Sequence, residues 1–147
     1  MLNGWSLVVR TSVLLLAAVG GFQDIARAQG ARELPGTYTL VTVDGHQLPY
    51  APVEPGRPAD APPPPAVTAS TFTVLTDSTF RMSMTYRMGA PGAERTMERQ
   101  FNGTYKAEGA GYTFTWTNAG RTPVALRGDT LVLNNEGILF AYVRQAH

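Results

Sequence analysis

The fold is decided by residues 79–88, which read TFRMSMTYRM. Every second position is apolar: Phe80, Met82, Met84, Tyr86 and Met88. The positions between them are mostly polar, and successive side chains of a β-strand point to opposite faces of a sheet. Residues 111–118, GYTFTWTN, alternate in the same way. The pattern therefore predicts strands that have one buried face and one solvated face.

Outward from this stretch, turn residues divide the chain into eight segments of the same kind: 36–43, 67–76, 79–88, 94–106, 111–118, 121–127, 130–134 and 138–144. Most links between them are short and contain glycine, asparagine or aspartate, as hairpin turns require. Hairpin-linked strands with one apolar face most simply close into a barrel, because closure removes the free edges. We predict an all-β fold, a single eight-stranded up-and-down antiparallel β-barrel, with a two-sheet sandwich as the alternative.

Charge and hydropathy predict how the third and fourth of these strands pair. If residues 89–92 form the turn, Arg87 faces Glu94 as an opposite-charge pair. The other partners in this register are Met88 with Ala93, Met84 with Met97, and Phe80 with Phe101. The same register turns Arg95 and Arg99 inward near one mouth of the barrel. A bulge that turns both arginines outward and an internal salt bridge are the alternatives.

Residues 1–28 have the features of a cleavable signal peptide. A positive charge precedes an apolar run over 11–22, which is too short to span a bilayer, and Ala26 and Ala28 form a small-residue cleavage site. We expect the mature domain, residues 29–147, to be exported to the periplasm or secreted. The chain has no cysteine and no second long apolar run, so we expect no membrane anchor after cleavage.

The composition of the mature chain excludes several classes of function. Removal of the leader leaves ten basic and ten acidic residues, so no basic surface for nucleic acid or anionic lipid is expected. The only histidines, His46 and His147, lack the spacing of zinc ligands, and no nucleophile motif accompanies them. We predict no enzymatic activity, no catalytic residue and no cofactor. Met82 and Met84 share a face and could ligate Cu(I), but such methionines are typical of a core, so no metal site is predicted.

The sequence resembles a known family at both ends of the predicted barrel. Gly36-Thr37-Tyr38 opens the first strand, and Arg144 lies near the end of the last strand. This resembles the lipocalin (calycin) pattern, in which a Gly-x-Trp on the first strand is covered by a basic residue from the final strand; here tyrosine replaces tryptophan. Residues 34–45, 103–105 and 128–133 also resemble small exported bacterial lipocalin-like proteins. The resemblance implies a barrel with an internal cavity.

A proline-rich segment, residues 49–65, is the exception to the short links. Eight of its seventeen residues are proline, so it cannot join a sheet and should be extended or disordered. Two interpretations stay open, because a long first loop closes one barrel end in lipocalin-like folds. The segment is either a lid over the barrel or a disordered connection.

The inner face of the barrel is the predicted ligand site, because an eight-stranded barrel is either filled by side chains or holds one small ligand. The residues expected to contact a ligand are Tyr38, Phe80, Met82, Met84, Tyr86, Arg95, Met97, Arg99, Phe101, Tyr105, Phe114 and Trp116. We predict non-catalytic binding of a small hydrophobic or amphipathic molecule in the barrel interior, with Arg95 or Arg99 orienting an acidic head group. The alternative is a packed barrel whose loops bind a protein partner in the cell envelope, as an inhibitor or envelope-maintenance factor.

Overall fold

The computed structural model describes residues 33–146, which form nine β-strands and no helix. The strands are β1 (Gly36–Val43), β2 (His46–Gln47), β3 (Ala66–Val74), β4 (Thr79–Met88), β5 (Arg95–Glu108), β6 (Gly111–Trp116), β7 (Arg121–Arg127), β8 (Thr130–Asn135) and β9 (Ile138–Arg144). The predicted segments agree with these bounds to within two residues at each end. The predicted signal peptide lies outside the described residues. Within the described part of the chain, there is no helix that could cross a membrane.

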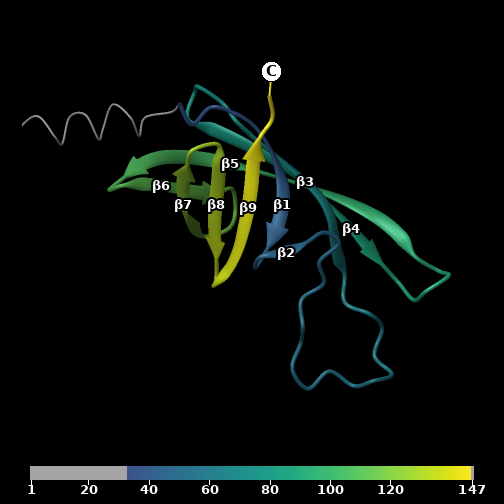
Figure 1. Cartoon of the computed structure of the whole chain (residues 1–147). Coiled ribbons are helices and arrows are strands. Elements are labelled where there is room, and N and C mark those ends of the chain that lie inside the picture. Colours follow the sequence, from purple (N-terminus) through teal and green to yellow (C-terminus); the bar gives the residue numbers. More distant parts are fainter. Residues whose placement is uncertain (1–32, 147) are drawn as a thin grey trace, which may run out of the picture. The chain divides into compact units, whose positions relative to one another are not determined.

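The sheet closes on itself. Each strand from β3 to β9 pairs antiparallel with its neighbour along the chain, and β1 pairs with β3 on one side and with β9 on the other. The short strand β2 only extends the half of the β1 edge that β3 does not reach, where Thr42 lies opposite Gln47. β1, β9 and β8 lie side by side in Figure 1. The prediction of an eight-stranded antiparallel barrel is confirmed, and the sandwich alternative is wrong.

The predicted pairing of β4 with β5 is wrong by two residues. Met88 lies opposite Arg95, and Phe80 lies opposite Gly103, because the turn takes six residues, 89–94, rather than four. Gly89 and Gly92 have φ angles of 105° and 85°, which other residues rarely adopt. A shift of two residues leaves every side chain on its predicted face, so the alternation could not detect the error.

The predicted ion pair between Arg87 and Glu94 survives this shift. Arg87 lies opposite Thr96, and its Nε atom is 3.6 Å from Oε1 of Glu94. Both side chains are close to half exposed, so the pair contributes little stability. The charges at the turn are therefore compatible with either register and do not choose between them.

Aromatic rings fill the middle of the barrel. Phe80 stacks on Phe72 and Phe114, with ring centroids 5.2 and 4.9 Å apart. Trp116 meets Phe80 edge to face at 4.8 Å, and Tyr142 meets Phe72 in the same way at 5.5 Å. Of these five side chains, all except Trp116 are fully buried. The contacts close the interior at this level, because aromatic pairs at such distances leave no gap for a ligand.

One end of the barrel is closed by residues near both described ends of the chain. Leu34 is buried there, and its carbonyl accepts a 2.7 Å hydrogen bond from the Tyr38 hydroxyl. Arg144 lies over the Tyr38 ring, 4.8 Å from its centroid, and donates to the Tyr38 hydroxyl at 2.6 Å and to the Pro35 carbonyl at 2.7 Å. This is the contact between first and last strands that the lipocalin resemblance implies.

The proline-rich segment is an exposed loop, shown at the bottom of Figure 1. Residues 51–65 contain no strand, but Tyr50 forms an antiparallel bridge with Val67, so the expectation that all of 49–65 stays outside the sheet is wrong at Tyr50. Arg57 holds the loop together, since it pairs with Glu54 and donates to the Pro62 carbonyl. The loop therefore has local structure of its own.

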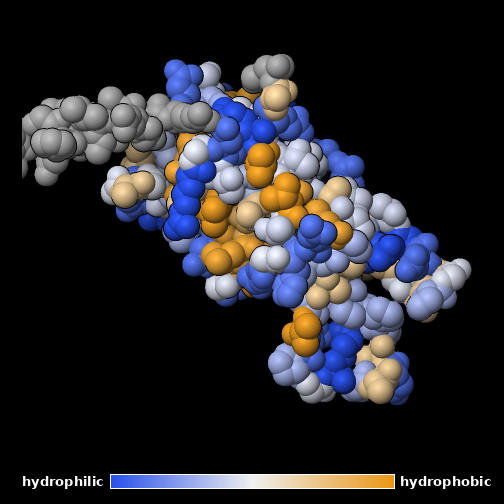
Figure 2. Space-filling model, in the orientation of Figure 1, coloured by the Kyte–Doolittle hydropathy of each residue, from blue (hydrophilic) through white to orange (hydrophobic). Residues whose placement is uncertain are grey.

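The outer surface of the barrel is mostly polar but has one apolar region. Val41 on β1 and Leu139 and Val143 on β9 are 42%, 46% and 38% exposed. Figure 2 shows apolar atoms gathered over these two strands. The outward-facing positions of the other strands are largely threonine, serine and charged residues.

Candidate functional site

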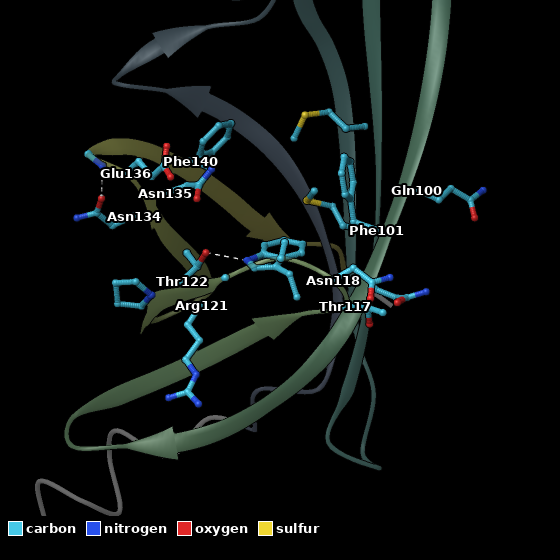
Figure 3. Close-up of a pocket in the computed structure, with 18 of the residues that line it drawn as sticks. Gln100, Phe101, Thr117, Asn118, Arg121, Thr122, Asn134, Asn135, Glu136 and Phe140 are labelled. Carbon is cyan, nitrogen blue, oxygen red and sulfur yellow. Dashed lines mark hydrogen bonds between the residues drawn. The ribbon is translucent and has the colours of Figure 1, made fainter.

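A pocket of about 820 Å³ lies at the end of the barrel opposite Arg144. We call it the mouth pocket (Figure 3); it is lined by Met82, Met84, Tyr86, Gln100, Phe101, Asn102, Trp116, Thr117, Asn118, Ala119, Gly120, Arg121, Thr122, Pro123, Asn134, Asn135, Glu136, Gly137 and Phe140. Its volume is within the range of small-molecule sites in proteins. The filled middle of the barrel separates this pocket from the closed end.

The mouth pocket has an apolar wall and a polar rim. The wall comes from inward-facing positions of four strands: Met82, Met84 and Tyr86 of β4, Phe101 of β5, Trp116 of β6 and Phe140 of β9. The rim comes from two hairpins: residues 117–120 form the turn between β6 and β7, and residues 134–137 comprise the end of β8 and the turn that leads into β9. Such a site suits a molecule that has an apolar body and a polar end.

A hydrogen bond fixes the indole ring of the wall. Trp116 Nε1 donates to Oγ1 of Thr122 at 2.7 Å, and the Thr122 side chain is itself fully buried. This bond joins the end of β6 to β7 across their turn, as the dashed line in Figure 3 shows. Because the indole N–H already has a partner, Trp116 offers the pocket its ring rather than a donor.

The rim carries amide groups and few charges. In the turn between β8 and β9, the Asn134 side-chain oxygen accepts a 3.0 Å hydrogen bond from the Gly137 N–H, which orders the turn. Asn118 and Asn135 add two further amides. Figure 3 shows Arg121 extending away from the other labelled side chains, so this guanidinium does not reach over the pocket.

The structure brings together five of the twelve residues predicted to contact a ligand: Met82, Met84, Tyr86, Phe101 and Trp116. Three others, Tyr38, Phe80 and Phe114, are fully buried away from the pocket. Phe80 and Phe114 belong to the aromatic cluster that fills the barrel, and Tyr38 belongs to the closed end. Tyr105 is also outside the pocket, and its hydroxyl donates a 2.7 Å hydrogen bond to the Leu75 carbonyl.

Arg95 and Arg99, predicted to face the mouth of the barrel, do not line the mouth pocket. Both lie on the same face of β5 as Phe101, but the hairpin of β4 and β5 projects beyond the barrel, and both are exposed (Figure 1). Met97, between them, is half-buried and also outside the pocket. Arg99 is nevertheless near the site, because it lies opposite Met84 of the pocket wall, and its charge opposes the rise that burial causes in the pKa of Tyr86.

The strand alternation did not predict that turn residues form part of the site, although the sequence carries a signal for them. In an up-and-down barrel, alternate hairpin turns lie at the same end. The turns at 117–120 and 134–137 must therefore share an end, and both are rich in asparagine and glycine. The strand alternation drew attention to the inner face alone.

Residues 33–146 contain no group of three or more histidine, cysteine, aspartate or glutamate side chains that could hold a metal ion. His46 instead stacks on Tyr50, with ring centroids 5.9 Å apart, and His147 lies outside the described residues. The Met82 sulfur, considered above as a Cu(I) ligand, accepts a hydrogen bond from the Tyr142 hydroxyl at 3.3 Å.

Comparison with known proteins adds no assignment to this geometry. No model of a known protein family matches the chain, and no curated protein matches it either.

Proposed function

We propose that this protein binds a small hydrophobic or amphipathic molecule, without catalysis, in the mouth pocket. The observation that carries the proposal is the apolar wall of six side chains that lies open beneath a rim of amides. The bound molecule occupies the mouth rather than the interior, since the aromatic cluster around Phe80 leaves no room deeper in the barrel. We also propose that binding takes place after export, in the periplasm or outside the cell.

An acidic head group fits the surroundings of the pocket. Tyr86 lines the wall and has Arg99 close enough to influence its ionisation. A carboxylate at that side of the pocket would meet an exposed guanidinium that forms no ion pair with a described residue. A fatty acid therefore combines the two kinds of contact, with its chain on the methionine and aromatic wall.

The test uses the fluorescence of Trp116, which is the only tryptophan after residue 28. Dodecanoate and 1-anilinonaphthalene-8-sulfonate are titrated into the mature protein, residues 29–147. We expect saturable changes in Trp116 emission, and we expect Ala119→Trp, which fills the rim, to abolish the changes measured with the naphthalene probe. Thr113→Trp, on the outer face of β6, is the matched control and should leave binding of the probe intact. No saturable change with either compound would disprove the proposal.

A further inference from the structure

The first half of β5 has an unpaired edge. β4 pairs with β5 continuously from Arg95 to Thr104, but β6 reaches only the part of β5 from Gly103 onward. The last contact on the β6 side is the hydrogen bond from Thr117 N–H to the Asn102 carbonyl, at 2.9 Å. Among the described residues, no strand pairs with 95–101 on this side, and Figure 1 shows this length of β5 leaving the barrel.

The free edge offers a regular series of backbone groups. The Asn102 carbonyl points toward the β6 side, and backbone groups alternate in direction along a strand. The N–H and C=O groups of Thr96, Glu98 and Gln100 therefore point away from β4, in the plane of the sheet, and are free at its edge. Those of the residues between them point toward β4. An extended chain laid along this edge would gain the hydrogen bonds of a further sheet strand.

The edge runs directly into the mouth pocket. Gln100, Phe101 and Asn102 line the pocket, so a strand added beside them passes its opening. Side chains of the added strand that share a face with Phe101 lie on the pocket side, and those opposite Gln100 lie on the outer side. Figure 3 shows this division, with Phe101 turned inward and Gln100 turned away.

Charges along the edge disfavour a second copy of this chain as the added strand. Each of the three antiparallel registers with the longest overlap places one pair of like charges directly opposite. These pairs are Arg95 with Arg99, Glu98 with Glu98, and Arg99 with Arg99. Like charges directly opposite one another destabilise a strand pair. The edge is thus protected from self-association while its backbone groups stay accessible.

We propose that the free edge of β5 binds an extended segment of another protein as an added antiparallel strand. The segment that fits has acidic residues opposite Arg95 and Arg99, a basic residue opposite Glu98, and apolar residues opposite Met97 and Phe101. This goes beyond small-molecule binding and does not depend on it, although the residue opposite Phe101 lies beside the mouth pocket.

A synthetic peptide tests the proposal directly. The capped sequence Leu-Thr-Glu-Lys-Val-Thr-Glu places its first residue opposite Phe101 and its two glutamates opposite Arg99 and Arg95. The control Glu-Thr-Leu-Lys-Glu-Thr-Val has the same composition with acidic and apolar positions exchanged. Binding of the labelled peptides to mature protein is followed by fluorescence anisotropy. We expect the first peptide to bind at least about tenfold more tightly.

Backbone methylation separates strand addition from other modes of binding. In the proposed register, the N–H of the central lysine of the peptide faces β5, whereas that of the following valine faces solvent. N-methylation at the lysine should weaken binding at least about tenfold, and N-methylation at the valine should have a much smaller effect. Arg95→Glu/Arg99→Glu, which reverses both charges, should reverse the preference between the two peptides.

Three results would overturn this inference: no binding of the first peptide at 1 mM, equal binding of the exchanged peptide, or equal effects of the two methylations. Dodecanoate binding is measured on the same protein sample. Binding of dodecanoate with failure of the peptide overturns strand addition alone, whereas the opposite result overturns only the proposed small-molecule function.

Discussion

At the scale of single residues, Gly103 shows how closely the core is packed. A Cβ atom at this position would lie 2.0 Å from the Thr115 carbonyl oxygen and 2.7 Å from Cζ of Phe80. The first neighbour is backbone and the second belongs to the filled aromatic cluster, so neither can move away easily. The absence of a side chain at Gly103 therefore allows Phe80 to lie flat across β5.

We predict that Gly103→Ala lowers the free energy of unfolding by at least about 2 kcal/mol, because it forces this overlap. Gly120→Ala is the matched control, since a Cβ atom there would meet nothing within 4 Å, and its backbone needs no positive φ. Urea unfolding followed by Trp116 fluorescence measures both. Equal stabilities of the two variants would contradict the packing described for Gly103.

Buried tyrosines predict how stability depends on pH. Burial raises the pKa of Tyr38, Tyr86, Tyr105 and Tyr142 above the ordinary value of about 10. In the unfolded chain these hydroxyls lose their protons near pH 10, while in the folded chain they keep them. The unfolded state then binds fewer protons, so stability is complete below about pH 10 and falls as the pH rises above it.

Urea midpoints between pH 8 and pH 11 measure this dependence, and we expect a decline that begins near pH 10. Tyr142→Phe removes the most buried of the four hydroxyls, so this variant should lose less stability across the same interval. Its stability at pH 8 should be lower by about 1 kcal/mol, because the variant loses the hydrogen bond between the Tyr142 hydroxyl and Ser70 Oγ. A flat profile to pH 11 in the parent protein would contradict the assignment.

At the scale of elements, the strands were predictable and the pairing of β4 with β5 was not. Period-two alternation located β4 and β7 to the residue, because each has one buried and one exposed face. Register between neighbours depends on the length of the turn, and Gly89 and Gly92 allow a turn longer than the simplest one. Gly103 opposite Phe80 was the missing signal, since a large ring in a filled core favours a glycine partner.

The proline-rich loop allows a prediction about a whole element. Because Tyr50 lies opposite Val67, replacement of residues 52–65 with Asn-Gly leaves Ala51 opposite Ala66 and a two-residue turn between them. None of residues 49–65 lines the mouth pocket. We therefore expect the shortened protein to bind dodecanoate with unchanged affinity and to unfold within about 0.5 kcal/mol of the parent.

Titration of dodecanoate into the shortened and the parent protein is the direct comparison. Weaker binding by the shortened protein would favour the interpretation of the loop as a lid over the barrel. The structure gives no contact between the loop and the pocket that would produce such a loss.

At the scale of the whole molecule, the closed end ties the described termini of the barrel together. Arg144 donates to the carbonyls of Glu33 and Pro35 and to the Tyr38 hydroxyl, and its Nε atom is 3.9 Å from Oδ1 of Asp129. We predict that Arg144→Ala lowers the free energy of unfolding by about 2 kcal/mol. Arg144→Lys should lower it by less, because lysine keeps the charge but lacks the planar guanidinium that donates to several acceptors at once. Arg127→Ala, with an exposed side chain, is the control and should cost less than about 0.5 kcal/mol.

Thermal unfolding by circular dichroism measures these three variants. Because the mouth pocket lies at the other end, Arg144→Ala should keep its affinity for dodecanoate wherever it is folded. Loss of ligand binding in a folded Arg144→Ala protein would show that the two ends are coupled.

The barrel as a whole was predictable from sequence, and the position of its candidate site was only partly so. Alternation and short turns led to a closed sheet, and the glycine-threonine-tyrosine opening led to the contact of Tyr38 with Arg144. The alternation gave an inward direction for Phe80, Phe114 and Trp116 alike. It could not show that the first two meet in the middle of the barrel while the third faces an opening, because that depends on depth along the barrel axis.

The meeting of both described ends at the closed end has a practical consequence. Gln145 N–H donates to the Thr37 carbonyl at 2.8 Å, so the chain enters and leaves the barrel at one place. A protein fused directly at either described end of the barrel, or a solid support coupled there, therefore attaches at the pole opposite the mouth pocket. An immobilised array of this protein would present its openings outward in a common orientation, as a capture surface or a reagentless sensor requires.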